Sequence, residues 1–242
     1  IQNLYMNYDF ELNVPKNLRG IKIREWVKFI DIYEKNKDNE SSEFLNKKMI
    51  EIFCGVNLKE LYKIPVSSFD GVVNHLYKVL NTESELTNTF KMVGTDGVEV
   101  EFGLIPNLDK MSYGEWEDLE NYIWDNKNIH RAMAVLYRPL IYQIGGKYRV
   151  HEYQGTDEYA EMMRDMPIDI ALAARVFFYR LVKKLGSYTM DSILKQYQQE
   201  QKEGKDSHKH SGKSGEDIKQ YLLLQKEMSE ELTKLQNSHF IN

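Results

Sequence analysis

The chain of 242 residues is long enough for one large domain or two small ones, and its composition is that of a folded protein. Hydrophobic residues make up 42% of it and charged residues 29%, so a core can be buried beneath a charged surface. The net charge of −5 gives no general attraction for nucleic acid or anionic lipid, and a single cysteine excludes an intramolecular disulfide. These properties, with no signal-peptide or membrane-span pattern, predict a soluble intracellular protein.

The first part of the chain predicts an irregular lead-in at residues 1–20 and a helical module at residues 21–87. The lead-in begins without an initiator methionine, so the true start of the protein is processed or lies outside this sequence. Apolar side chains between Trp26 and Tyr33 recur at helical spacing. Helices are expected at about 21–36, 42–55, 58–62 and 69–81, the last of them capped by Ser67 or Ser68 after the break at Pro65.

Residues 88–186 predict a second module that contains two β-hairpins. Strands at 89–93 and 98–102 flank the turn sequence Gly94-Thr95-Asp96-Gly97, and strands at 140–144 and 147–153 flank Gly145-Gly146. Together with the helices, these strands predict a mainly α fold with two hairpins, of the α+β class.

Helices are also expected within this second module. Ser112 and Glu115 have the spacing of a capping box and open a helix that ends near residue 125. Another helix runs from Asn128 to residues 138–139, and a short one is capped by Thr156. A long core helix follows Pro167 and extends over residues 168–186.

The two modules show the same order of features. Glu25-Trp26 is echoed by Glu115-Trp116, and Ile64-Pro65 by Met166-Pro167. This order is consistent with duplication of a helix–helix–Pro–helix unit, with a hairpin inserted in the second copy. Chance similarity is the competing interpretation.

The C-terminal part predicts a helix end and polar linker at residues 187–215, followed by a last helix at residues 216–242. Apolar side chains recur in that helix at alternating spacings of three and four, with one polar residue at Gln225. The pattern predicts a short seam that docks on a partner or on the chain's own body. Its candidate contact residues are Ile218, Tyr221, Met228, Leu232 and Leu235.

Residue types that could carry chemistry form no catalytic, cofactor-binding or metal-binding pattern. Cys54 lies in an apolar run and is expected to be a buried small side chain. His208 and His210 lie in the polar linker, which cannot preorganise metal ligands. The remaining candidates are expected to be structural histidines, and they are His75, His130 and His151. We therefore expect a protein that is not an enzyme and has no cofactor and no metal.

Aromatic and cationic residues interleave around the second hairpin. They are Arg131, Tyr137, Arg138, Tyr142, Lys147, Tyr148 and Arg149. Such a pattern can bind single-stranded nucleic acid, but tyrosine and arginine are also enriched at protein interfaces. With a negative net charge we favour a protein interface, whose candidate contact residues are Tyr142, Tyr148 and Arg149. An acidic face with Trp116, Asp118, Glu120 and Asp125 is expected to be solvated or to receive a basic partner.

Four segments between residues 100 and 185 resemble a known protein family in their sequence and order. They are residues 102–111, which contain Ile105-Pro106-Asn107, then 114–119, 132–139 with Tyr137-Arg138-Pro139, and 166–172. In this order they resemble a family of poorly characterised proteins of tailed bacteriophages, whose members are taken to be virion structural or assembly proteins.

The resemblance implies a non-enzymatic virion structural protein that packs into a head, neck or tail assembly formed in the cytoplasm of the bacterial host. Other phage structural or tail proteins are the expected partners, with self-association as a further case; a membrane is not expected and nucleic acid is disfavoured. The alternatives are a tail or baseplate assembly chaperone absent from the finished particle, and a nucleic-acid-binding protein that uses the Tyr/Arg hairpin.

Overall fold

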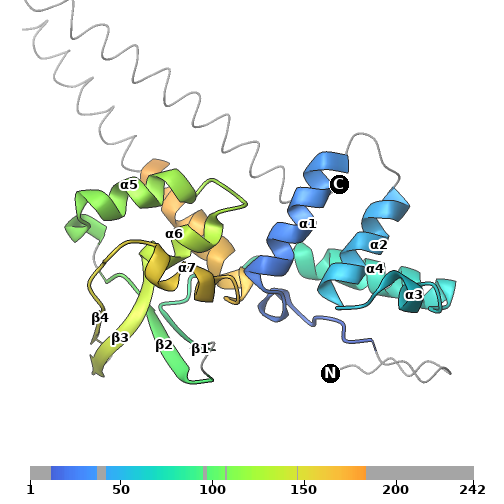
Figure 1. The fold of residues 1–242 in the computed structure, drawn as a ribbon, viewed down its shortest axis with the longest axis horizontal. Helices are drawn as coiled ribbons and strands as arrows, with labels where there is room; N and C mark the ends of the chain where they lie inside the picture. The colour runs from blue at the N-terminus through green and yellow to red at the C-terminus, as the bar shows by residue number, and fades with distance from the viewer. Residues whose placement is uncertain (1–11, 37–41, 95–96, 107, 146, 184–242) are drawn as a thin grey trace, which may run out of the picture. The chain divides into compact units, whose positions relative to one another are not determined.

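The computed structural model describes residues 12–36, 42–94, 97–106, 108–145 and 147–183, and the structural statements below concern these residues. Helices are combined with a four-stranded antiparallel sheet of order β1-β2-β3-β4, which confirms a mixed α+β fold (Figure 1). The sequence predicted two hairpins; in the structure all four strands belong to one sheet. The docking seam at 216–242 lies outside the described residues.

The helices before the sheet are α1 (Ile23–Asn36), α2 (Ser42–Phe53), α3 (Leu58–Leu61) and α4 (Val66–Leu80), after a short 3-10 helix, η1 (Leu18–Gly20). The apolar stripe of α1 is buried as its spacing predicts, and Phe29 packs on Phe53 of α2 with ring centroids 5.1 Å apart. The predicted start of α4 near residue 69 is wrong, because the helix begins directly after Pro65. Proline suits this place, since its φ of −58° is already helical and the first turn needs no N–H from it.

The sheet consists of β1 (Thr89–Val93), β2 (Glu99–Leu104), β3 (Tyr137–Ile144) and β4 (Lys147–Val150). β1 pairs with β2 over its whole length, and β3 pairs with β4 with a bulge between Leu140 and Tyr142. The central pair is shorter, because β2 and β3 pair only from Phe102–Pro139 to Leu104–Tyr137. Beyond Pro139, β3 and β4 therefore continue as a two-stranded ribbon, called the β3–β4 ribbon below.

Three helices accompany the sheet: α5 (Tyr113–Tyr122), α6 (Ile129–Leu136) and α7 (Asp157–Met163), with a short 3-10 helix, η2 (Leu108–Lys110), before them. The predicted extension of α6 to residues 138–139 is wrong, because the backbone is already extended at Tyr137, with φ −119° and ψ 122°. Pro139 disfavours the helical conformation of the residue before it, Arg138. The backbone groups that leave the helix here hydrogen-bond to β2 instead.

The helix termini test the predicted caps. The capping box is confirmed: Ser112 Oγ accepts from the Glu115 backbone N–H, and Glu115 accepts from the Ser112 backbone N–H. Thr156 precedes α7, but its hydroxyl makes no cap hydrogen bond and instead accepts from Arg131 Nη1 at 3.0 Å. The last helix runs from residue 168 to at least residue 183, the end of the described residues.

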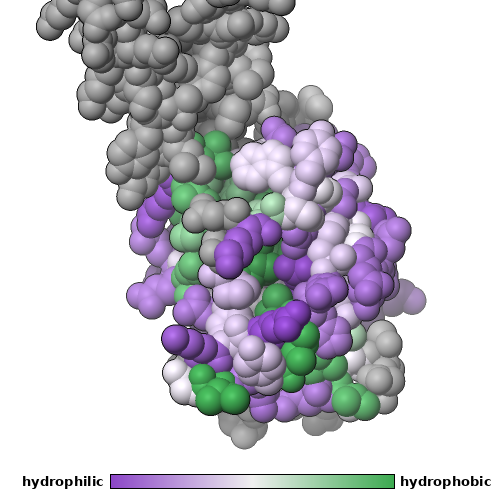
Figure 2. All heavy atoms as spheres, turned by 90° about the vertical axis from the view of Figure 1, so that its left-hand side faces the viewer, coloured by the Kyte–Doolittle hydropathy of each residue, from purple (hydrophilic) through white to green (hydrophobic). Residues whose placement is uncertain are grey.

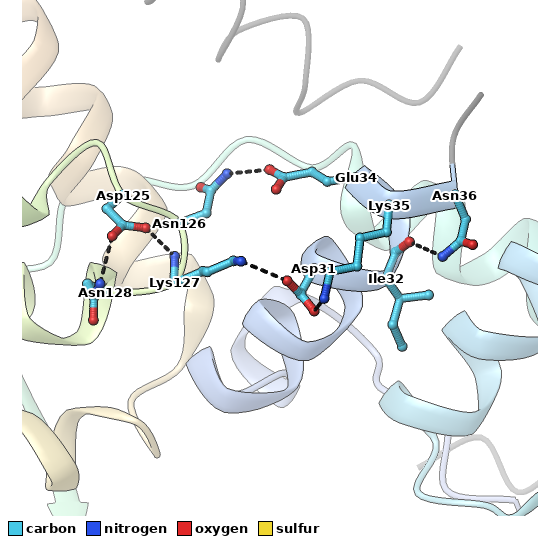
Figure 3. A network of polar contacts seen from close by, with 9 residues as sticks. All are labelled: Asp31, Ile32, Glu34, Lys35, Asn36, Asp125, Asn126, Lys127 and Asn128. Carbon is cyan, nitrogen blue, oxygen red and sulfur yellow. Dashed lines mark hydrogen bonds and ion pairs between the residues drawn. The ribbon is translucent and has the colours of Figure 1, made fainter. Parts of the chain in front are cut away.

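The segment before α1 pairs with the chain around Pro167. The backbone N–H of Ile23 donates to the Met166 carbonyl at 3.0 Å. The backbone N–H of Ile168 donates to the Ile21 carbonyl at 2.8 Å. Figure 3 shows a second connection, in which Lys127 Nζ lies 3.0 Å from Asp31 and Asn126 donates to Glu34 at 3.2 Å. Both connections fall within residues 1–175, which form one unit of the chain, while residues 176–242 form the other. The predicted module boundary at residue 87 and the duplication stay predictions.

No helix within the described residues is both long enough and apolar enough to cross a lipid bilayer.

Candidate protein interface on the β3–β4 ribbon

Burial changes abruptly along strand β3. Its first three residues, Tyr137–Pro139, are buried between β2 and the helices. After the bulge the side chains become exposed, with exposed fractions of 51% for Ile141, 52% for Tyr142 and 74% for Ile144. One strand therefore has a core end and an outer end that presents large apolar side chains to solvent.

The register of β3 and β4 brings basic residues beside these apolar side chains. Tyr142 lies opposite Arg149, and Ile144 lies opposite Lys147, so all four side chains share one face of the ribbon. Among the described residues, the ion pair that Arg149 makes is long and exposed, with Glu152 at 3.5 Å. We call Tyr142, Ile144, Lys147 and Arg149 the ribbon surface.

Hydrophobic and hydrophilic side chains alternate over this part of the molecule. Figure 2, which looks at the left-hand side of Figure 1, shows green groups set among purple ones at its lower end, where the strand turns lie in Figure 1. The ribbon surface combines apolar area with cations, which is a composition found in protein interfaces.

Tyr148 anchors the ribbon to the rest of the sheet. Its ring lies over Gly103 of β2, where a Cβ atom would come within 2.7 Å of Tyr148 Cε2 and 2.6 Å of Leu140 Cδ2. The Tyr148 hydroxyl donates to the Leu104 carbonyl at 2.7 Å, and burial raises the pKa of this phenol. Tyr148, predicted as a contact residue, is thus half-buried and supports the ribbon from the face opposite Tyr142.

A buried ion pair fixes the base of the same strand. Arg138 Nη2 lies 2.8 Å from Glu115 Oε1, and the side chains of both residues are buried. The other Glu115 oxygen accepts from the Ser112 backbone N–H at 2.6 Å. One carboxylate therefore caps α5 and also neutralises the charge of Arg138 on β3. The guanidinium also lies over the ring of Tyr153, which donates through its hydroxyl to Asp118.

The structure divides the predicted aromatic and cationic set. Tyr137 is fully buried and its hydroxyl donates to the Thr87 carbonyl, while Arg131 binds Asp157 at 2.6 Å. With Arg138 buried as well, only Tyr142, Lys147 and Arg149 remain exposed. Sequence reasoning missed Ile141 and Ile144, because isoleucines in a strand indicate a core; their closeness to the Gly145-Gly146 turn was the available signal.

The cysteine and the histidines differ in their surroundings. Cys54 is buried, and burial raises the pKa of its thiol to about 12, so it stays protonated at neutral pH. His130 is buried, His75 hydrogen-bonds to the Pro15 carbonyl at 2.8 Å, and His151 is exposed. Among the described residues no three His, Cys, Asp or Glu side chains are grouped to hold a metal ion. His208 and His210 lie outside those residues.

No family model, curated protein or solved structure matches this chain.

Proposed function

We propose that this chain is a non-enzymatic structural protein of a bacteriophage particle, and that its ribbon surface contacts a neighbouring protein. The observation that carries the proposal is the exposure of Tyr142 and Ile144 on a ribbon that is fixed at its base. Large apolar side chains exposed together on a soluble protein mark interaction sites, because their burial against a partner removes apolar area from water.

The support beneath the ribbon favours binding over a merely mobile turn. The Tyr148 ring packs against Gly103, and the Arg138–Glu115 pair holds the start of β3. An interface placed on such a base loses little conformational freedom on association. The assignment to a phage particle comes from the sequence resemblance.

The C-terminal helix is the second contact that we propose. Its apolar seam contains Ile218, Tyr221, Met228, Leu232 and Leu235. Deletion of residues 205–242 is expected to weaken partner binding and to preserve the cooperative thermal transition of the rest of the chain. Loss of that transition would contradict a separate docking segment.

The test uses the full chain in the phage that encodes it. Mass spectrometry of purified particles is expected to find the protein in stoichiometric amounts, and Ile144→Asp is expected to reduce its incorporation, since a charge on a buried contact is costly. The matched control is Val93→Asp, because Val93 of β1 is also an exposed apolar strand residue, at 62%. Equal loss from both variants, or no loss from Ile144→Asp, contradicts the ribbon interface.

Two alternatives have separate outcomes. If the protein is present in infected cells but absent from finished particles, it acts as an assembly chaperone, and the same ribbon binds its client. A nucleic-acid function requires binding of single-stranded oligonucleotides that weakens as salt is added. Burial of Tyr137 and Arg138 disfavours this function, since it leaves one aromatic and two cationic side chains of the original set exposed on the ribbon.

A further inference from the structure

Helix α5 presents a second exposed surface, with the opposite charge to the ribbon. Leu119 and Glu115 face the interior, and the outward positions are spaced three and four residues apart, so they form one stripe. Within it, Tyr113 is 80% and Trp116 is 39% exposed, and Glu117 and Glu120 are exposed carboxylates. We call Tyr113, Trp116, Glu117 and Glu120 the α5 stripe.

Within the described part of the chain, the charges of both surfaces lack strong partners. Among the described residues, no ion pair involves Glu117, Glu120 or Lys147, and Arg149 has only its long contact with Glu152. The β1–β2 pair differs, because Lys91 and Glu99 neutralise each other there at 3.0 Å.

The two surfaces match in composition and have similar dimensions, of about 7–10 Å. Each has two exposed apolar or aromatic side chains next to two like charges, acidic on the α5 stripe and basic on the ribbon surface. The stripe spans about 10 Å from Tyr113 to Glu120 at the rise of an α-helix. The ribbon surface covers about 7 Å along β3 and is two strands wide.

Their placement prevents them from meeting within one molecule. In Figure 1, α5 lies at one end of the sheet region and the turn between β3 and β4 lies at the other. Contact between a ribbon surface and an α5 stripe therefore requires two copies of the chain.

We infer that the partner of the ribbon surface is the α5 stripe of a second copy of the chain. This inference rests on the proposed binding function of the ribbon and names its occupant. Lys147 and Arg149 face Glu117 and Glu120 of the next copy, while Tyr142 and Ile144 cover Tyr113 and Trp116. Each contact joins two different surfaces, so it repeats either reciprocally, in a two-fold dimer, or from copy to copy, in a ring or filament.

Sedimentation velocity of the full chain, over rising protein concentration, tests this arrangement. Wild-type protein is expected to associate into dimers or larger species, and association is expected to weaken with salt. Lys147→Glu with Arg149→Glu, or Glu117→Lys with Glu120→Lys, is expected to weaken it by about 100-fold, since like charges then face each other.

The decisive sample is an equimolar mixture of these two double variants. In it every interface regains opposite charges, so association is expected to return to near the wild-type level. Glu83→Lys with Glu85→Lys is the matched control, because it reverses two exposed carboxylates outside both surfaces and is expected to leave association unchanged. Circular dichroism of each variant verifies that it is folded.

Three results would overturn the inference. The wild-type chain stays monomeric, the mixture of double variants fails to reassociate, or the control variant loses association as strongly as the double variants do. A dimer that the charge reversals leave intact would overturn it too. The particle-incorporation test with Ile144→Asp and Val93→Asp does not depend on these results, so a failure of self-association is distinguishable from a failure of the ribbon interface itself.

Discussion

The two ends of strand β3 have the same strand geometry and opposite surroundings. At the first end, Tyr137–Pro139 pair with β2, and the only charge there, Arg138, is neutralised by Glu115. At the second end, Tyr142 and Ile144 have a single neighbouring strand and are exposed. The comparison indicates that the first end serves stability, since the charge of Arg138 has an internal partner there, and that the second end is the one that we propose for binding. Substitutions can break or sharpen this distinction.

The largest effect on folding is expected from Glu115→Ala. The substitution leaves the Arg138 guanidinium buried without its carboxylate and removes half of the α5 capping box, so the free energy of unfolding is expected to fall by about 3–5 kcal/mol. Urea denaturation measures it. Glu117→Ala, an exposed change two positions along the same helix, is expected to stay within about 0.5 kcal/mol, and similar losses from both would refute the role of the ion pair.

Acid is expected to destabilise the folded chain through His130 of α6. Burial, with Arg164 and Arg131 nearby, lowers the pKa of this imidazole from 6.5 to about 4. On lowering the pH, the unfolded chain therefore binds the proton before the folded chain does. The free energy of unfolding is at its full value above pH 6.5 and falls by about 3 kcal/mol in total as the pH drops towards 4. Urea titrations of wild type and His130→Gln across this range compare the slopes, and equal slopes would exclude His130 as the cause.

Gly103→Ala is expected to have a smaller effect that reaches both ends. The new Cβ would lie 2.6 Å from Leu140 Cδ2 and 2.7 Å from Tyr148 Cε2, so the ribbon must shift, at a cost of about 1–3 kcal/mol. Gly114→Ala is a suitable control, since a Cβ there meets nothing within 4 Å. If thermal unfolding shows that Gly103→Ala is as mild as the control, the packing of Tyr148 does not hold the ribbon.

The smallest effect on folding is expected from Ile144→Asp, which should lower the free energy of unfolding by less than about 1 kcal/mol. Its effect on binding is expected to be large, which is the reverse of the pattern for Glu115→Ala. Thermal melts and particle incorporation measured on the same preparation separate the two. A strongly destabilised Ile144→Asp variant would show that the outer end of β3 belongs to the core.

Local sequence signals predicted much of the fold. The burial of the α1 stripe follows from its helical spacing, and the Ser112–Glu115 capping box is a pattern closed within four residues. Where the sequence failed, a longer-range contact decided: α6 ends before Tyr137 because the following residues pair with β2. That the two predicted strand pairs join in one sheet also depends on a longer-range contact, between β2 and β3.

For the candidate site, too, local sequence signals and tertiary contacts determined different features. Sequence by itself determined that tyrosine, arginine and isoleucine gather around Gly145-Gly146, because strand alternation and turn residues are local properties. Only the tertiary structure decided that Tyr137 and Arg138 are core residues while Tyr142 and Arg149 are surface residues. The physical reason is that alternation assigns side chains to a face of the sheet, whereas their burial depends on where the neighbouring strand and the covering helices end.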